Sequence, residues 1–166
     1  ARLALEENLA LNSSIGFGWG MGTAYLGLGI VAQAQGKHRQ AVDMFRKSLD
    51  TLSELGARQD VARVLVEMSR SIYALGNDAE ADRGWREALN IAMETQGTFV
   101  ALEALVGIAM LRAKQGNIEQ ALELSWIVLG HPASLSETKD RADSLRAKLE
   151  AQLTPTQIEA IQDGVV

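Results

Sequence analysis

AQGKHRQA at residues 34–41, ALGNDAEA at 74–81 and KQGNIEQA at 114–121 share one pattern, with glycine at positions 36, 76 and 116 and alanine at 41, 81 and 121. Both sets of positions advance by 40 residues, so the chain contains an internal repeat. Glycine readily adopts the left-handed conformation that closes a helix at its C-terminus. An apolar helical pattern resumes after each glycine. The repeating unit is therefore predicted to be a helix, a tight turn and a second helix.

Apolar spacing on both sides of the second turn supports this unit. Before the turn, apolar residues step by four, three, four and three, as one face of a helix requires: Val61, Leu65, Met68, Ile72 and Leu75. After the turn, a second such face consists of Ala81, Trp85, Ala88 and Ala92. In the first repeat, Gly29 stands inside a helical pattern, where glycine costs roughly 1 kcal/mol against alanine. We expect close packing against a neighbouring helix to offset that cost.

The first repeat resembles the tetratricopeptide repeat family. The family signature of a large residue, Leu-Gly, Gly, Ala and an aromatic residue is matched by Tyr25, Leu28, Gly29, Gly36, Ala41 and Phe45. The later repeats depart from it, with Ser69 and Ala109 at the Gly29 position and Ser125 at the aromatic position. The step of 40 residues also exceeds the roughly 34 of the family, which indicates longer helices. The resemblance implies an all-α, right-handed superhelix of helical hairpins.

The repeat register predicts a single domain over residues 1–166. Its parts are a half repeat at 1–15, repeats at about 17–56, 57–96 and 97–130, and a C-terminal cap at 134–166. The half repeat follows from Ala1, Leu5 and Leu9, which lie 40 positions before Ala41, Phe45 and Leu49. Because a repeat does not bury its apolar face alone, we expect an exposed apolar face at the N-terminal end. We also expect the chain to be a fragment of a longer protein.

The pattern changes at the C-terminal end. Gly130, His131 and Pro132 are expected to end the third repeat, and a polar helix and a short helix opened by Pro155 are expected to cap the array. From Gly130 onward, the chain also resembles the C-terminal tail of bacterial multidomain regulators, through the segments 131–133 and 137–142. Such STAND/NB-ARC-type proteins couple a nucleotide-binding ATPase switch to a tetratricopeptide sensor array. The resemblance implies the sensor end of a cytoplasmic bacterial signalling or transcriptional regulator.

The tetratricopeptide resemblance also implies a partner-binding face. In that family the first helix of each hairpin lines the concave side of the superhelix, where a peptide or flexible segment binds. The residues so placed in this chain are Leu26, Ile30, Gln33, Arg63, Glu67, Arg70, Tyr73, Met110 and Lys114. The Lys and Asn clamp with which chaperone-docking members hold a terminal carboxylate is absent. Leu26, Ile30 and Ala34 occupy the matching positions in the first repeat.

Composition argues against other classes of protein. The net charge is −5 with Lys and Arg scattered, so the basic footprint of a direct nucleic-acid binder is missing. The chain has no cysteine and no apolar run long enough to span a membrane. His38 and His131 have no carboxylate or histidine at ligand spacing, so we predict neither a metal nor a cofactor. No histidine accompanies the serines, so we predict that the chain is not an enzyme.

Two functions remain open. The leading hypothesis is a non-catalytic interaction or sensor module that binds a protein, a peptide or another domain of its parent chain. The alternative is a stand-alone scaffold that forms homo-oligomers through its exposed repeat ends. The glycine-rich run from Gly16 to Gly22 lacks the Lys-Ser/Thr pair and the preceding strand of a phosphate-binding loop. We expect this run to be a flexible lead-in to a helix, with Trp19 available for ligand contact.

Overall fold

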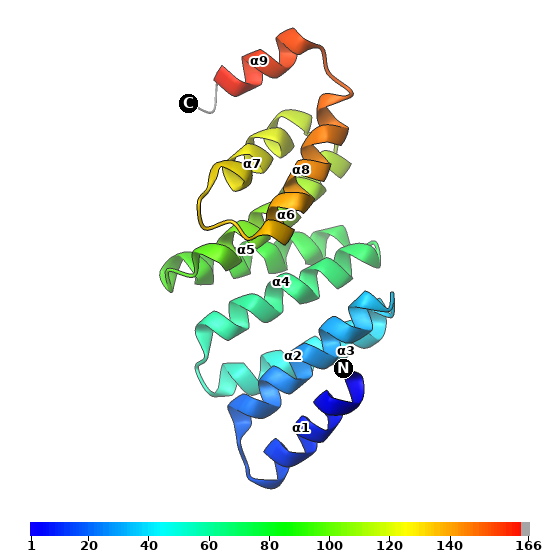
Figure 1. Cartoon of the computed structure of the whole chain (residues 1–166), viewed down its shortest axis with the longest axis vertical. Helices are drawn as coiled ribbons and strands as arrows, with labels where there is room; N and C mark the ends of the chain where they lie inside the picture. The colour runs from blue at the N-terminus through cyan, green and yellow to red at the C-terminus, as the bar shows by residue number, and fades with distance from the viewer. Residues whose placement is uncertain (164–166) are drawn as a thin grey trace. The chain divides into compact units, whose positions relative to one another are not determined.

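The computed structural model describes residues 1–163, and the regular elements in this part of the chain are all α-helices (Figure 1). They are α1 (Arg2–Ser14), α2 (Gly18–Ala34), α3 (His38–Glu54), α4 (Arg58–Ala74), α5 (Asp78–Glu94), α6 (Thr98–Lys114), α7 (Ile118–Gly130), α8 (Ser136–Glu150) and α9 (Pro155–Asp163). The chain divides into two compact units, unit 1 (Ala1–Gly97) and unit 2 (Thr98–Val166). Successive helices pack together from α1 to α5 in unit 1 and from α6 to α8 in unit 2, and α9 packs on α7. The predicted all-α architecture of tetratricopeptide-like hairpins is confirmed.

The helices fall within the predicted repeat bounds. The half repeat contains α1, and the three full repeats contain the pairs α2–α3, α4–α5 and α6–α7. The cap contains α8 and α9, and α9 begins at Pro155 as predicted. The last three residues of the predicted cap, 164–166, lie outside the described part of the chain. The organisation of the whole chain as a single domain stays a prediction.

The turns that end the helices recur every 20 residues, which is half of the 40-residue step between the three sequence segments. Backbone φ is positive at Gly16, Gly36, Gly56, Gly76, Gln96 and Gly116, which follow one another every 20 residues. At each of these turns two backbone N–H groups donate back into the helix that is ending. After α2, for example, the N–H of Gly36 donates to the carbonyl of Gln33, and that of Lys37 to the carbonyl of Ala32, both at 2.9 Å. This paired pattern is the glycine-closed helix terminus that the sequence predicted.

The turn after α5 is the exception, because Gln96 holds a φ of 58° where the other turns have glycine. A side chain in this region costs roughly 1–2 kcal/mol. The next residue, Gly97, increases the conformational entropy of the unfolded chain, which lowers stability. A larger residue would fit there, because a Cβ at position 97 would meet no atom closer than 3.5 Å. We therefore expect the double substitution Gln96→Gly with Gly97→Asn, which copies Gly76–Asn77, to raise the free energy of unfolding by about 1 kcal/mol.

Urea denaturation of this double variant measures the gain. The matched control is Gly76→Gln with Asn77→Gly, which imposes the exceptional turn on the α4–α5 connection and should lose a similar amount. Equal stability of the control and the wild type would contradict the explanation.

Unit 1 is held together by close approaches at small residues. A Cβ built on Gly29 of α2 would lie 2.4 Å from the ring of Phe45 on α3, so only glycine fits there. Near the start of the same hairpin, Ser48 Oγ donates to the carbonyl of Gly22 at 2.7 Å. In the second hairpin the glycine lies on the second helix instead of the first, since Gly84 of α5 approaches Ser69 of α4. The expected close packing of a neighbouring helix at Gly29 is present, and whether it offsets the cost of the glycine stays a prediction.

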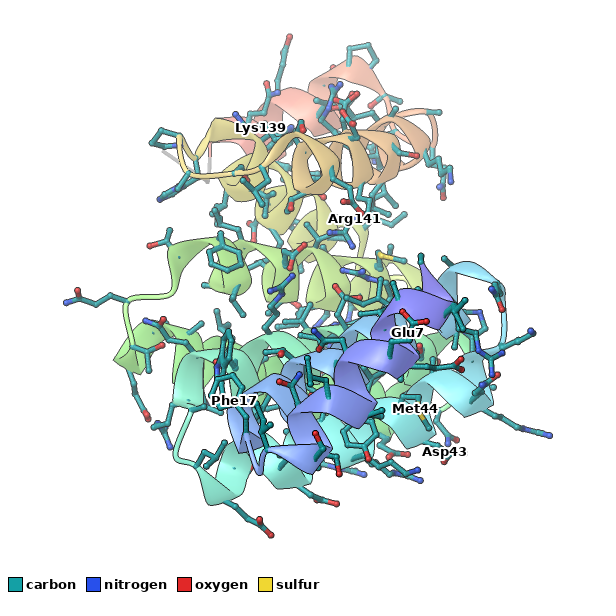
Figure 2. The ribbon with its side chains drawn as sticks, turned by 60° about the horizontal axis from the view of Figure 1, so that its bottom comes forward. Glu7, Phe17, Asp43, Met44, Lys139 and Arg141 are labelled. Carbon is teal, nitrogen blue, oxygen red and sulfur yellow. The ribbon has the colours of Figure 1, made fainter. Side chains whose placement is uncertain are left out.

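In unit 2, α8 packs on both helices of the α6–α7 hairpin. Thr138, Ala142 and Leu149 form its buried side. Arg141 donates from Nη2 to Glu103 Oε1 of α6 at 2.9 Å, and Figure 2 shows Arg141 and Lys139 on different sides of α8. The buried side of α8 and this ion pair therefore attach the capping helix to the third repeat.

The N-terminal helix α1 leaves apolar side chains uncovered. Leu3 is 69% exposed and Leu11 is 61% exposed, whereas Leu52, a core residue of α3, is fully buried. Leu5 is covered, because it lies against Gly27 of α2. The predicted exposed apolar face at the N-terminal end is confirmed.

Candidate partner-binding face

In unit 1 the predicted face is carried by α2 and α4, the first helices of their hairpins. Gln33 joins the two helices, because its Nε2 donates to the carbonyl of Glu67 at 3.0 Å and to Ser71 Oγ at 2.9 Å. A side chain with both contacts is held in one place. Gln33 therefore positions α2 against α4 in this structure.

The two apolar members of the face on α2 belong to the core rather than to an open surface. Leu26 is 4% exposed and lies in a cluster with Phe45, Leu52 and Val64. Ile30 is half-buried and packs on the same cluster. Direct contact of a partner with Leu26 would require the cluster to open, whereas Ile30 retains exposed surface.

The charged and aromatic members on α4 are engaged to different degrees. Arg70 donates from Nη1 to Glu67 Oε2 at 2.8 Å, and both side chains are largely buried. The ring of Tyr73 lies 5.7 Å from that of Trp85 on α5, tilted by 49°. Arg63 is exposed and has no ion pair among the described residues. Arg63 is thus the cation of this face that is most accessible to a partner.

Unit 2 carries the remaining two predicted residues on α6. Met110 is half-buried and packs against a cluster that includes Val106, Val128 and Ala142. Lys114 is exposed at the last position of α6. Met110 therefore belongs to the packing between α6, α7 and α8. Lys114 places its positive charge at the C-terminal end of α6.

Polar contacts at the helix starts of unit 1 were not predicted from the sequence. Trp19 donates from Nε1 to Asp60 Oδ2 at 2.8 Å, which links the start of α2 to the start of α4. Gln59 donates from Nε2 to the carbonyl of Thr95 at 3.0 Å, and Arg58 pairs with Glu94. Asp60, which accepts the hydrogen bond from Trp19, lies in the first turn of α4, where the helix dipole stabilises its negative charge.

The prediction of a flexible lead-in at the glycine-rich run is wrong from Gly18 onward. Helix α2 begins at Gly18, and Gly20 and Gly22 are buried within it. A Cβ on Gly20 would meet Asn12 at 2.5 Å, and one on Gly22 would meet Leu52 at 2.6 Å. These glycines let α2 approach its neighbours, a purpose that composition alone does not reveal.

The two histidines have local structural surroundings. His131 Nδ1 accepts a hydrogen bond from the backbone N–H of Ala133 at 3.1 Å, beside the proline that ends the third repeat. His38 begins α3, and its Nδ1 is buried without a hydrogen-bond partner. Among residues 1–163, no three His, Asp or Glu side chains gather as a metal site would require.

A cleft of about 820 Å³ opens in unit 2 between the start of α7 and α9. Its lining combines the carboxylates Glu119 and Glu123 with apolar Leu153 and Ile161. The amides of Asn117, Gln120 and Gln157 complete its polar surface. The described residues that line the cleft include neither a histidine nor a basic side chain.

Residues 23–51 match the tetratricopeptide repeat. This tetratricopeptide match covers the α2–α3 turn and includes every signature residue from Tyr25 to Phe45. Tetratricopeptide repeats generally mediate protein–protein interaction. No curated protein matches the chain. Within the described residues, none of the helices has both the length and the apolar character needed to cross a bilayer.

Proposed function

We propose that the chain is a non-catalytic module that binds a protein partner or another domain of its parent chain. The observation that supports this most is the tetratricopeptide match in the first hairpin, together with two further hairpins of the same geometry. In unit 1 these hairpins place α2 and α4 side by side, fixed by Gln33. The seven of those residues that lie in unit 1 would form a face that receives the partner, with Arg63 as an accessible cation, and Met110 and Lys114 would belong to a face of unit 2.

The parent chain would be a bacterial signalling or transcriptional regulator of the cytoplasm. The resemblance of the segment after Gly130 to regulator tails supports this, and that segment holds the cap in place through Arg141 and Glu103. The test is the sequence encoded upstream of Ala1. A nucleotide-binding domain there would support the regulator, and another kind of neighbour would contradict it.

Charge reversal on α4 tests the binding face. We expect Arg63→Glu to weaken a complex with the partner at least about tenfold, because the exposed cation would become an anion at the contact. Isothermal titration of the purified partner, or of the remainder of the parent chain, measures the affinity. Arg83→Glu is the matched control, since Arg83 is an exposed arginine on α5. Equal affinities for wild type and Arg63→Glu would remove this face from the proposal.

A self-assembling scaffold is the second candidate, and the uncovered apolar residues of α1 favour it. Leu3 and Leu11 would then be covered by another copy of the chain. Sedimentation across a range of concentrations separates the two functions. A mass that rises with concentration in wild type, and not in Leu3→Glu with Leu11→Lys, would support the scaffold.

A further inference from the structure

Two adjoining clefts lie on the other side of α2 from the predicted face. The first, of about 320 Å³, is bounded by α1 and α3 and has α2 as its floor. The second, of about 430 Å³, lies at the α2–α3 turn, and Gln40 lines both. Successive helix residues are about 100° apart, so Leu28 and Val31 in this floor point away from Leu26 and Ile30. Figure 2 shows this side of unit 1, with Met44 of α3 beside α1. We call the two clefts together the α1–α3 groove.

The floor of the groove is apolar and incompletely covered. Tyr25, Leu28, Val31 and Met44 line it and are all half-buried. Forty residues later, Leu65 and Ser71 occupy the positions of Tyr25 and Val31, and both are buried. At these two positions the floor is more open in the first repeat, whereas Met68 and Gly84, the counterparts of Leu28 and Met44, are half-buried as well.

The rims of the first and second repeats also carry different residues. Between α3 and α5 of the second repeat, Arg46 and Glu80 approach each other to 3.9 Å across the two helices. The corresponding residues of the first repeat are Glu6 and Gln40, which cannot form such a pair. Glu6 instead pairs with Arg2 on its own helix at 2.7 Å. No ion pair joins α1 to α3 in the described structure.

The rim of the groove is basic although the chain as a whole is acidic. Its charged lining consists of Arg2, Lys37, Arg39, Lys47 and a single carboxylate, Glu6. In the whole chain, acids outnumber bases, with 21 Asp and Glu against 16 Lys and Arg. At the rim of the groove the balance is the opposite, with four basic side chains and one acid. Arg39 and Lys47 have no ion-pair partner among the described residues. The Lys47 ammonium is held 5.7 Å above the ring of Tyr25, at the edge of the apolar floor.

We propose that the α1–α3 groove binds an acidic segment of a protein partner, with an apolar side chain on its floor and carboxylates on Lys47 and Arg39. The volume of the first cleft admits an anchor of the size of leucine or phenylalanine, and the unbranched side chain of Met44 adapts to the anchor's shape. The flanking carboxylates neutralise two cations that form no ion pair among the described residues. This is a second surface, separate from the face that contains Arg63.

A blocked hexapeptide tests the proposal, with a Leu-Phe pair flanked on each side by two aspartates. Fluorescence anisotropy of the labelled peptide measures its affinity for the whole chain. We expect replacement of its aspartates by asparagines to weaken binding about tenfold, because the ion pairs at the rim are lost. We expect Lys47→Gln with Arg39→Gln to weaken binding of the aspartate peptide to a similar extent.

Matched controls separate the groove from general charge and folding effects. Arg83→Gln with Lys148→Gln removes the same charge from α5 and α8 and should leave the affinity unchanged. Met44→Glu should abolish binding, whereas Met93→Glu, at a methionine that is 70% exposed, should not. Thermal melts confirm that each variant is folded.

Four results would overturn the proposal. Equal binding of the aspartate and asparagine peptides would indicate a purely apolar site, and wild-type affinity of the Lys47 and Arg39 variant would place the site elsewhere. Self-association that Met44→Glu abolishes would show that a second copy fills the groove. Failure of the peptide to bind, with the complex of the Arg63 face intact, would sink this inference alone and leave the proposed function standing.

Discussion

Replacing Trp85 by alanine should lower the free energy of unfolding by about 3–5 kcal/mol, the range for truncating a buried aromatic residue. Trp85 is 1% exposed and is the largest fully buried side chain of the described residues. It belongs to the helix face that also contains Ala81 and Ala88, both fully buried. Its ring lies beside that of Tyr73 on α4. Removal would leave a cavity between α4 and α5 that alanine-sized neighbours cannot fill.

Urea denaturation followed by circular dichroism measures this loss. Trp19→Ala is the matched control, because it makes the same chemical change at a side chain that is 47% exposed. We expect the control to lose less than half as much, mainly through the hydrogen bond to Asp60. Equal losses in the two variants would show that the hairpin core is not centred on Trp85.

Replacing Gly29 by alanine should also destabilise the chain, although alanine is the better helix former. The new Cβ would lie 2.4 Å from the ring of Phe45, which is fully buried and has no free space to move into. Overpacking of this kind costs about 1–3 kcal/mol, against a gain in helix propensity of roughly 1 kcal/mol. We expect a net loss of up to about 2 kcal/mol.

A second substitution tests the cause of that loss. In a Phe45→Leu background the ring is absent, and Gly29→Ala should become neutral or stabilising. Gly130→Ala is a control without the clash, because no atom lies within 4 Å of a Cβ built there. A loss at Gly29 that persists unchanged without the Phe45 ring would argue against close packing as its cause.

The hairpins were predictable because their signals are local. A glycine at a helix end and apolar residues spaced by three and four are properties of short segments, so Gly36, Gly76 and Gly116 located the turns. Gln96 was not predictable in the same way. Its positive φ is imposed by the same turn geometry that glycine adopts elsewhere, and nothing in its side chain signals this.

The binding face was less predictable, because it depends on what each side chain meets across the repeat. The spacing placed Leu26 and Arg70 on the expected helices, but the burial of Leu26 and the pairing of Arg70 with Glu67 depend on neighbouring residues. The glycines at 20 and 22 illustrate the same limit. A glycine-rich run suggests flexibility until the partners that require glycine are known, and here they are Asn12 and Leu52.

The α1–α3 groove had no signal in the repeat pattern. At its rim, Glu6 and Gln40 occupy the positions at which the next repeat has the Arg46–Glu80 ion pair. Lys47 and Arg39 are ordinary exposed cations in the sequence. Only the folded α2–α3 turn and α3 bring Lys47 and Arg39 to the rim of the same groove.

Site-specific photo-crosslinking tests most directly whether the chain holds a protein partner on its predicted face. A benzophenone amino acid would replace Arg63 in one version of the parent protein and Arg83 in another, and both would be irradiated in the cells that produce it. We predict a defined cross-linked product from position 63, either with a partner or within the parent chain, and none from position 83. No product from either position, or the same products from both, would contradict the proposal that this face holds a partner.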